Sequence, residues 1–429
     1  MLITLGLTLT VTLLLGVPIA FALGMSGALA LFVGSDVSPL MVLGNSAFRG
    51  MDSFPLMAIP FFVLGGELMG ISITTALINF ASSLVGHIRG GLAHVTTLSC
   101  MFFGGITGVG VAETAAIGTI VIPAMEKKGY DKAFAAAVVA ASSTLGPIVP
   151  PSVPMVLYAL AVGGSVSISA LFLAGVVPAI LITAVFMLVS YVIARRNGYP
   201  VESAFELKRV WHTFRKATWA LLMPVIIVGG MVSGVFTATE AAVVSAFYAA
   251  FVGFVINRNL RLSDLPKYFV NTAIVTSIVL MLLAFSKVVS WILTVQNVPG
   301  LLTAAMQSAT SSPLMFMLMV NVLLFIIGCF IDSAAGIIMV APVMAPVAAA
   351  FHINPVHFGF MLVMNLILGM VTPPVGVILF VSAGIADLKL GSIVAKIWPY
   401  VIAAYGILAL VMLFPEITLA IPRLAGYVN

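Results

Sequence analysis

The chain has 429 residues, of which 62% are apolar and only 7% are Asp, Glu, Lys or Arg, and its formal net charge is +5. Soluble globular proteins devote about a quarter of their residues to the charged types, so this composition excludes that class. Three stretches, 133–194, 288–331 and 333–386, contain none of the four, and each exceeds the roughly 20 residues that one bilayer crossing needs. The chain is therefore a membrane protein with several passes.

Residues 1–45 are apolar, and the first Lys or Arg is Arg49. A secretory signal peptide would begin with a basic region and end at a small-residue cleavage site, so we expect this segment to stay in the mature protein. It can form two passes or one long tilted helix. An amphipathic stretch, residues 74–90, follows further along.

Residues 91–126 predict a break within a hydrophobic segment. Their centre reads Gly104-Gly105-Ile106-Thr107-Gly108-Val109-Gly110, and glycines at this density interrupt a helix. Unpaired backbone at membrane depth is tolerated only where it is buried in protein or lines a cavity. We interpret the segment as a re-entrant helical hairpin; the alternative is a full crossing with a glycine-packed interface.

Three basic loops, within residues 127–132, 195–216 and 258–267, indicate the topology, because Lys and Arg mark the cytoplasmic side. Two passes fit between the first and second loops, at about 133–163 and 167–194, and two fit between the second and third, at about 217–236 and 237–257. A pass at about 268–296 then reaches the opposite face, and one at about 356–386 returns to Lys389 and Lys396. This alternation of sides along the chain, which we call the loop parity, holds only if residues 298–350 enter and leave the membrane from the same face. It therefore predicts a second hairpin.

The chain also contains an internal repeat. Residues 113–125 (ETAAIGTIVIPAM) align without gaps on 332–344 (DSAAGIIMVAPVM), and 145–151 (LGPIVPP) align on 368–374 (LGMVTPP). The loop parity gives the two copies opposite orientations. Inverted repeats with broken helices that meet near the midplane are typical of secondary transporters.

The predicted fold is therefore an all-α polytopic membrane protein of two inverted-topology repeats, 1–200 and 217–429, with a cytoplasmic basic linker at 201–216. In each repeat a proline pair, Pro150-Pro151 or Pro373-Pro374, interrupts the pass after the hairpin. Each proline removes an N–H and clashes with the preceding turn. We predict half-helices whose ends offer carbonyl oxygens to a cation and positive dipoles to an anion; the alternative is a kink around a neighbouring helix.

Glu113 and Asp332 are acids within the two hairpins, at equivalent places in the repeat. An intramembrane carboxylate is a functional-site hypothesis by default, and cation binding, helix N-capping and proton carriage are all open. Neighbouring neutral oxygens suit a monovalent ion, although each hydroxyl can instead bond to its own helix. The Na⁺ candidates are Thr107, Gly108, Glu113, Thr114, Ser143, Pro147, Asp332, Ser333, Thr372 and Gly376; the substrate candidates are Pro150, Pro151, Ser152, Asn365, Pro373 and Pro374.

Glu240 and Lys287 are interpreted as structural. Glu240 stands three residues after Thr237, the spacing of a capping box, and Lys287 can extend to the interface or pair with an acid. The motifs of intramembrane hydrolases, zinc proteases and ATP-binding loops do not occur in the chain. We therefore expect no enzymatic activity and no cofactor, and transport that draws on an ion gradient or a separate subunit.

The segments Gly104–Gly108, Ala112–Gly118, Ile122–Met125, Leu145–Ser152, Gly234–Ala242, Asn354–Gly359 and Thr372–Gly376 resemble the large membrane subunit of TRAP transporters, the DctM family. The resemblance implies Na⁺-coupled, elevator-type uptake of an organic acid, such as a C4-dicarboxylate or sialic acid, across a bacterial inner membrane. It also implies two partners, a small DctQ-type membrane subunit on a separate chain and a periplasmic solute-binding protein of the DctP type.

Family members often have Ser-Gly-Ser and Ala-Asp at the first hairpin tip, where this chain has Thr107-Gly108-Val109 and Ala112-Glu113, so Na⁺ versus H⁺ coupling stays open. The alternatives are a stand-alone Na⁺- or H⁺-coupled dicarboxylate symporter of the ion transporter superfamily, and a membrane scaffold or channel subunit. No Lys or Arg lies at a hairpin tip or proline break. An anionic substrate would need half-helix dipoles and hydroxyls, or a basic residue from elsewhere.

Overall fold

The computed structural model describes residues 1–34 and 37–428, and the regular secondary structure within them is entirely helical. Seven of the described helices are long and apolar enough to cross a membrane, or eight spans result if a helix pair bent by 58° counts as one. The seven are Ile168–Asn197, Leu207–Val232, Ala238–Ile256, Leu262–Val295, Pro313–Phe330, Ser333–Ala350 and Leu390–Leu413. The chain is thus a multi-pass membrane protein, as its composition predicts.

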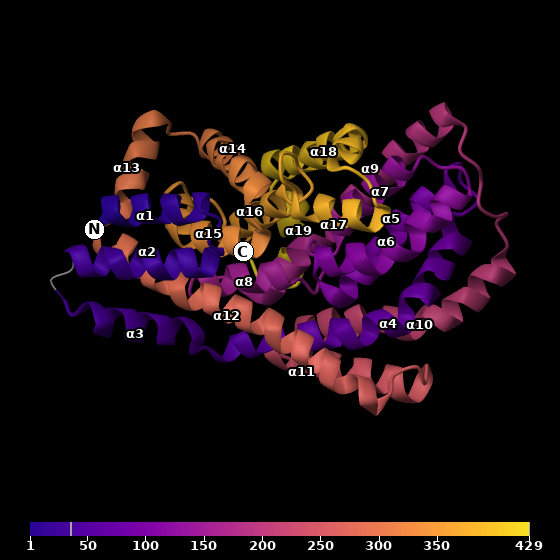
Figure 1. Cartoon of the computed structure of the whole chain (residues 1–429), viewed down its shortest axis with the longest axis horizontal. Coiled ribbons are helices and arrows are strands. Elements are labelled where there is room, and N and C mark those ends of the chain that lie inside the picture. Colours follow the sequence, from indigo (N-terminus) through magenta and orange to yellow (C-terminus); the bar gives the residue numbers. More distant parts are fainter. Residues whose placement is uncertain (35–36, 429) are drawn as a thin grey trace.

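The N-terminal segment doubles back on itself. Between α1 (Leu2–Leu14) and α2 (Ile19–Gly34) stands Gly16, whose φ of +76° favours glycine, and the two helices lie side by side in Figure 1. Residues 2–34 therefore form two short antiparallel helices rather than one long tilted helix, and neither is among the seven helices long enough to cross a membrane. That they make two passes stays a prediction. Next come α3 (Pro39–Met51), the short η1 (Phe54–Met57) and the long α4 (Ala58–Val85).

The first predicted break is present at Gly108, between α5 (Gly91–Thr107) and α6 (Gly110–Lys127). Both outer ends of this pair lie beside one segment, because the Gly90 N–H donates to the Pro200 carbonyl at 3.1 Å and Lys128 pairs with Glu202 at 3.4 Å. The two helices therefore form a hairpin. An interrupted pass follows, made of α7 (Lys132–Ser142), η2 (Ser143–Leu145) and α8 (Val153–Ala161), and α9 (Ile168–Asn197) comes next.

The second half starts with α10 (Leu207–Val232) and α11 (Ala238–Phe251), and the predicted capping box of Thr237 and Glu240 is present between them. The π-helix η3 (Val252–Ile256) and the short η4 (Leu262–Asp264) lead into α12 (Leu265–Val295).

The second hairpin consists of α14 (Pro313–Phe330) and α15 (Ser333–Ala350), whose outer ends meet where the Phe316 and Phe351 rings stack at 4.5 Å. The predicted range of 298–350 is therefore too long. Its first part is a separate helix, α13 (Val298–Ala309), because Ser312 caps α14 and Pro313 occupies its first position, which starts a new helix. The chain ends with α16 (Pro355–Gly369), α17 (Val377–Ala386), α18 (Leu390–Leu413) and α19 (Glu416–Leu424).

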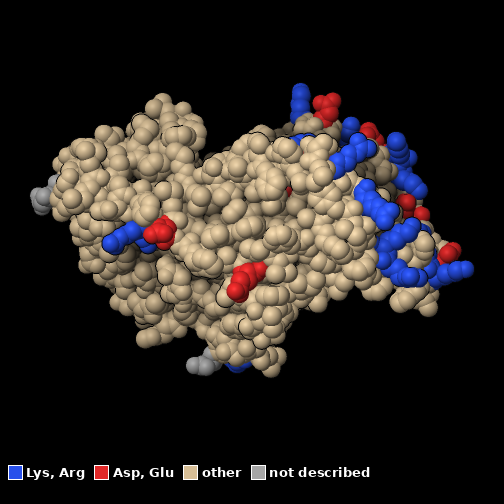
Figure 2. Space-filling model, turned by 90° about the horizontal axis from the view of Figure 1, so that it is seen from below, with Lys and Arg blue, Asp and Glu red and all other residues tan. Residues whose placement is uncertain are grey.

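Lys and Arg side chains gather at one end of the molecule, which we call the basic end (Figure 2). Figure 1 shows the connections α6–α7, α9–α10 and α11–α12 toward that end. At the start of α18, Lys396 pairs at 3.1 Å with Asp131, which stands between α6 and α7. The α17–α18 connection therefore lies beside the first basic loop, as the loop parity predicts.

The centre of the molecule is formed by α7 and α16, the first halves of the two interrupted passes. Every residue of 133–142 and of 356–369 is buried. Ser382 of α17 donates to the Ala136 carbonyl of α7 at 2.7 Å, which joins the two interrupted passes directly. The first break, residues 143–152, is buried except for the partly buried Val149, whereas at the second break Pro373 is half-buried and Pro374 is exposed.

Candidate ion and substrate site

The tip of the first hairpin packs into the break of the pass that follows it. A Cβ on Gly104 would lie 2.8 Å from the Gly146 Cα. Gly108 has a φ of +62°, and a Cβ there would lie 3.2 Å from the Val153 backbone nitrogen. Glycine is required at both positions, because any side chain would separate the tip from the break. The structure thus brings Thr107 and Gly108 against residues 146–153.

Glu113 lies in the first turn of α6 and is completely buried. Its carboxylate faces Gly146, where a Cβ would overlap one of the oxygens, and the Cys100 thiol lies beside it. Neither oxygen makes a hydrogen bond of normal geometry to any described residue. A buried anion without partners is costly unless a cation or proton neutralises it. The N-cap position of α6 belongs to Val109, so the capping alternative does not hold for Glu113.

Two hydroxyl candidates bond to their own helices. Thr114 and Ser143 each donate to a carbonyl one turn earlier, at 2.8 Å. A hydroxyl that donates in this way still has lone pairs for an ion. The Thr107 hydroxyl is different, because it is buried and has no partner among the described residues.

The break itself is held by Ser152. Its hydroxyl donates to the Pro147 carbonyl at 2.5 Å and accepts from the Met155 N–H at 3.3 Å, which caps α8. The two candidates Pro147 and Ser152 are thus joined by a hydrogen bond across the break. Pro150-Pro151 and Pro373-Pro374 each separate two half-helices, which confirms the predicted interruptions.

The second hairpin tip differs from the first. Asp332 is half-buried and caps α15, since its carboxylate accepts from the Ala334 N–H at 2.9 Å. Asp332 is therefore the N-cap of α15, and an additional role of its carboxylate in ion binding stays a prediction. Ser333 follows it and is buried.

The break after α16 packs against this hairpin through two glycines. A Cβ on Gly369 would lie 2.5 Å from the Gly328 backbone. Gly376 has a φ of +62°, and a Cβ there would lie 3.2 Å from the Thr372 carbonyl oxygen. The Thr372 hydroxyl donates to a carbonyl one turn earlier at 2.8 Å. Thr372, Pro373, Pro374 and Gly376 thus form one tight turn beside α14.

Asn365 lies in α16, more than one turn before the break. Its amide donates to the backbone carbonyl of Asn321 at 3.0 Å and to the Asn321 side-chain oxygen at 2.7 Å. The side chain therefore joins α16 to α14. Asn321 did not emerge from the sequence as a candidate, although an amide within the charge-free stretch 288–331 is a signal that could have found it.

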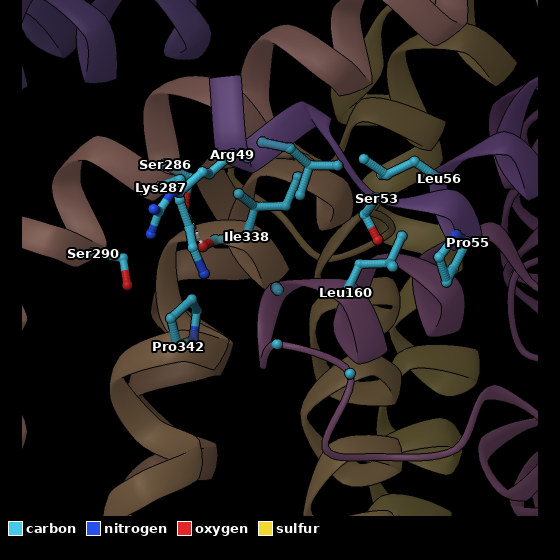
Figure 3. A pocket seen from close by; sticks show the side chains of 15 residues that line it. Arg49, Ser53, Pro55, Leu56, Leu160, Ser286, Lys287, Ser290, Ile338 and Pro342 are labelled. Atoms are coloured by element: carbon cyan, nitrogen blue, oxygen red, sulfur yellow. Dashed lines mark hydrogen bonds between the residues drawn. The ribbon is translucent and has the colours of Figure 1, made fainter. Parts of the chain in front are cut away.

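Two cavities lie where α12 faces a hairpin. One of about 530 Å³ is lined by Thr107, Glu67 and Val275 among others. The other, of about 210 Å³, is lined on one side by Arg49 and Lys287, with Ile338 and Pro342 of α15 next to them, and on the other side by Ser53, Pro55, Leu56 and Leu160 (Figure 3). Sequence reasoning missed both cations as site residues, because neither lies near a glycine or proline break.

A multi-pass helical protein with two hairpins and two interrupted passes packed together in its interior has the architecture of a transport protein. The solved structure of the Alcanivorax borkumensis YdaH transporter has a similar fold, with a TM-score of 0.60 at 15% sequence identity, over 89% of each chain. Residues 7–417 match the family described as tripartite ATP-independent periplasmic transporter, DctM component. The chain belongs to this family of TRAP transporter large permeases and is not an enzyme.

Its relatives differ in substrate. The C4-dicarboxylate large permease protein DctM of Rhodobacter capsulatus is 35% identical over 426 residues, 96% of this chain and 97% of that one. The sialic acid permease protein SiaM of Vibrio cholerae is 37% identical over 414 residues, 96% of each chain. The isethionate permease protein DctMQ of Oleidesulfovibrio alaskensis is 39% identical over 407 residues, 94% of this chain and 64% of that one.

Proposed function

We propose that this large permease carries a small organic acid into a bacterial cell together with Na⁺. The observation that carries the proposal is the buried Glu113 at the first hairpin tip, whose carboxylate has the Cys100 thiol and the Gly146 backbone as its polar neighbours and is not paired with any described cation. The substrates in the names of the relatives, C4-dicarboxylate, sialic acid, isethionate and 2,3-diketo-L-gulonate, are all anions. An organic anion is therefore the substrate class that we expect here.

The surroundings of Glu113 suit a monovalent cation. Ser143 and the backbone of the break supply neutral oxygens near this carboxylate, and Thr107, at the hairpin tip, has a hydroxyl without a partner among the described residues. One carboxylate with neutral oxygens can bind a monovalent ion and still release it. A second ion would bind beside Asp332, Ser333, Thr372 and Gly376. A proton on Glu113 is the alternative at the first position.

The movement that we propose is an elevator-type displacement of one body against another. The moving body comprises the two hairpins, about 91–126 and 313–350, and the interrupted passes, about 133–163 and 356–386. In its support, the Ser382–Ala136 hydrogen bond joins the two interrupted passes, and the outer ends of each hairpin meet. The repeats 1–200 and 217–429 would then be inverted, with the linker 201–216 and the basic end in the cytoplasm.

Two partners belong to the proposal: a small DctQ-type membrane subunit and a periplasmic solute-binding protein of the DctP type. The name DctMQ and its greater length, of which this chain covers 64%, support the small subunit. The inner membrane of a bacterium is the location that such a system requires.

Reconstitution tests the proposal. Purified permease with its small subunit is placed in proteoliposomes, and uptake of labelled succinate, sialic acid, isethionate and 2,3-diketo-L-gulonate is measured with and without an inward Na⁺ gradient. We expect one acid to accumulate only with Na⁺ and the binding protein present. Accumulation without the binding protein would indicate a stand-alone symporter, and absence of flux under every gradient would indicate a scaffold or channel subunit.

Glu113→Gln should abolish the Na⁺ dependence. The matched control is Glu416→Gln, since Glu416 is an exposed acid that pairs with Arg423 on the surface at 2.8 Å and contributes little. Equal Na⁺ dependence of the Glu113 variant and the wild type would refute the ion role of this carboxylate.

A further inference from the structure

Two cations share one cavity that no described acid lines. Arg49, near the end of α3, and Lys287, in α12, are both exposed residues that line the cavity of about 210 Å³ (Figure 3). Within the described chain, no ion pair involves either of them. Asp52 is close in sequence but does not line the cavity. Two like charges on one small cavity create a positive potential that favours an anionic ligand.

Backbone packing holds the two cations together. Gly50 lies against α12, where a Cβ would be 2.8 Å from the Leu283 carbonyl oxygen and 3.0 Å from the Lys287 Cβ. Any larger residue would separate α3 from α12. Arg49 and Lys287 are therefore close together because their helices are in direct contact, not because two flexible side chains meet by chance.

The cavity lies far from the basic end. Lys287 follows Leu265, the first residue of α12, by about six helical turns, or about 33 Å. That length is about the thickness of the hydrocarbon core. The cavity therefore faces the side opposite the basic loops, which is the periplasmic side in the proposed orientation.

The remaining lining suits a small acid. Ser53 and Ser290 place hydroxyl groups around this cavity of about 210 Å³. Lys287 also lines an adjoining cavity of about 420 Å³, together with Tyr158. The Tyr158 hydroxyl is buried without a partner among the described residues. A ligand held by Lys287 thus has polar groups on both sides of it.

We propose that Arg49 and Lys287 form an outer anion site, which binds the carboxylate or sulfonate group of the substrate on the periplasmic side before the substrate reaches the hairpin tips. The inference rests on the proposed uptake of an organic acid. Arg49 offers the planar fork that pairs with a carboxylate, and Lys287 adds a point charge. This site supplies the positive charge that both hairpin tips and both proline breaks lack.

Thiol labelling measures the potential in this cavity without a need for transport. Ser290→Cys is treated in intact cells with membrane-impermeant methanethiosulfonates, one anionic (sulfonatoethyl) and one cationic (trimethylammonioethyl). The native Cys100 and Cys329 are buried and give little background. Ser53→Cys, on the other side of the cavity, serves as a second reporter if the first variant folds poorly.

The ratio of anionic to cationic labelling rates is the quantity compared. Replacing both Arg49 and Lys287 by Gln should lower it about tenfold or more, because two charges within several ångströms of the thiol are removed. Lys267→Gln is the matched control, since it removes the same charge from the other end of α12 and should leave the ratio unchanged. An unchanged ratio in the double variant, or labelling only from the cytoplasmic side, would overturn the proposal.

Protection experiments identify the occupant. Succinate, sialic acid or isethionate should slow labelling of the reporter in the Arg49 and Lys287 background, and a neutral amide such as succinamide should not. If none of the acids protects and only removal of phospholipid changes the rate, the site binds a lipid headgroup and the proposal is wrong. In uptake assays the double Gln variant should raise KM about tenfold or more with less effect on kcat, as for loss of a charged hydrogen bond.

The outcomes separate this inference from the proposed function. Failure of Na⁺-driven uptake by the wild type would refute the function, whereas an unchanged labelling ratio refutes the outer anion site alone. Wild-type KM in the double variant would also refute the site, with the function intact.

Discussion

The same substitution at two matched glycines should have opposite consequences. Gly146 and Gly369 occupy equivalent places in the internal repeat, within LGPIVPP and LGMVTPP. A methyl group at Gly146 would overlap the Glu113 carboxylate, and its next neighbour outside that side chain is the Ser143 carbonyl oxygen at 3.4 Å, an ordinary contact. A methyl group at Gly369 would meet the Gly328 backbone, with carbon atoms at 2.5 Å and the oxygen at 2.6 Å.

These neighbours determine the cost. Overpacking a well-packed interior costs about 1–3 kcal/mol. For Gly146→Ala we expect the lower end, about 1 kcal/mol, because the end of one side chain can move. For Gly369→Ala we expect about 3 kcal/mol or more, because two helix backbones must separate. Displacing the carboxylate should raise the Na⁺ concentration for half-maximal uptake about tenfold or more, as expected when a charged contact worth about 1.4 kcal/mol is lost.

Two assays separate the effects. The fraction of each variant that stays monodisperse after heating in detergent reports stability, and a Na⁺ titration of uptake reports ion binding. Gly146→Ala should be close to wild type in the first and impaired in the second; Gly369→Ala should fail in the first. If Gly146→Ala lost heat stability as Gly369→Ala does, or kept wild-type Na⁺ dependence, the assigned role of the Glu113 carboxylate would be refuted.

Three further substitutions test individual contacts. Asp332→Ala should lower the free energy of unfolding by about 1 kcal/mol, because it removes the cap of α15, and it should abolish Na⁺-dependent uptake. Asp332→Asn should keep the heat stability but not the uptake. Wild-type uptake by the Asn variant would exclude an ion role. Asn365→Leu should destabilise by about 1–3 kcal/mol because Asn321 loses its partner, with KM unchanged; a raised KM would place Asn365 in the substrate site after all. Ser286→Ala removes a 2.9 Å hydrogen bond from α12 to the Ile338 carbonyl of α15, which is a contact between the proposed static and moving bodies. Initial uptake rates should therefore show a larger change in kcat than in KM. A change in KM alone would argue against movement at this contact.

The helix breaks could be predicted from the sequence because their causes are local. Gly108 and the two proline pairs interrupt helices through their own backbone chemistry, and the structure has breaks at each of them. The start of the second hairpin is an exception, because a local signal is present there but the predicted hairpin begins too early, at residue 298. Ser312 and Pro313 begin a new helix within an apolar stretch that contains no charge to mark a boundary.

Contacts between distant segments were beyond reach. Nothing local to Arg49 or Lys287 indicates that they share a cavity, because their proximity depends on Gly50 lying against a helix more than 200 positions later. The hydrogen bond between Asn365 and Asn321 is another such contact. It directs the Asn365 amide toward α14, whereas the sequence suggested a substrate contact near the proline break. Polar residues in apolar stretches mark positions of interest, but only packing assigns their partners.

The repeat also conceals an inequality between its two acids. Asp332 is itself the N-cap of α15 and accepts a backbone N–H, whereas Glu113 lies inside the first turn of α6, completely buried and without a hydrogen bond of normal geometry among the described residues. The space over Gly369 is filled by the Gly328 backbone, while that over Gly146 holds the Glu113 carboxylate. The first hairpin can therefore seat its tip at low cost only when a cation or proton neutralises this carboxylate. The Asp332 carboxylate already accepts a backbone N–H, so we expect neutralisation to matter less for the packing of the second hairpin than for that of the first.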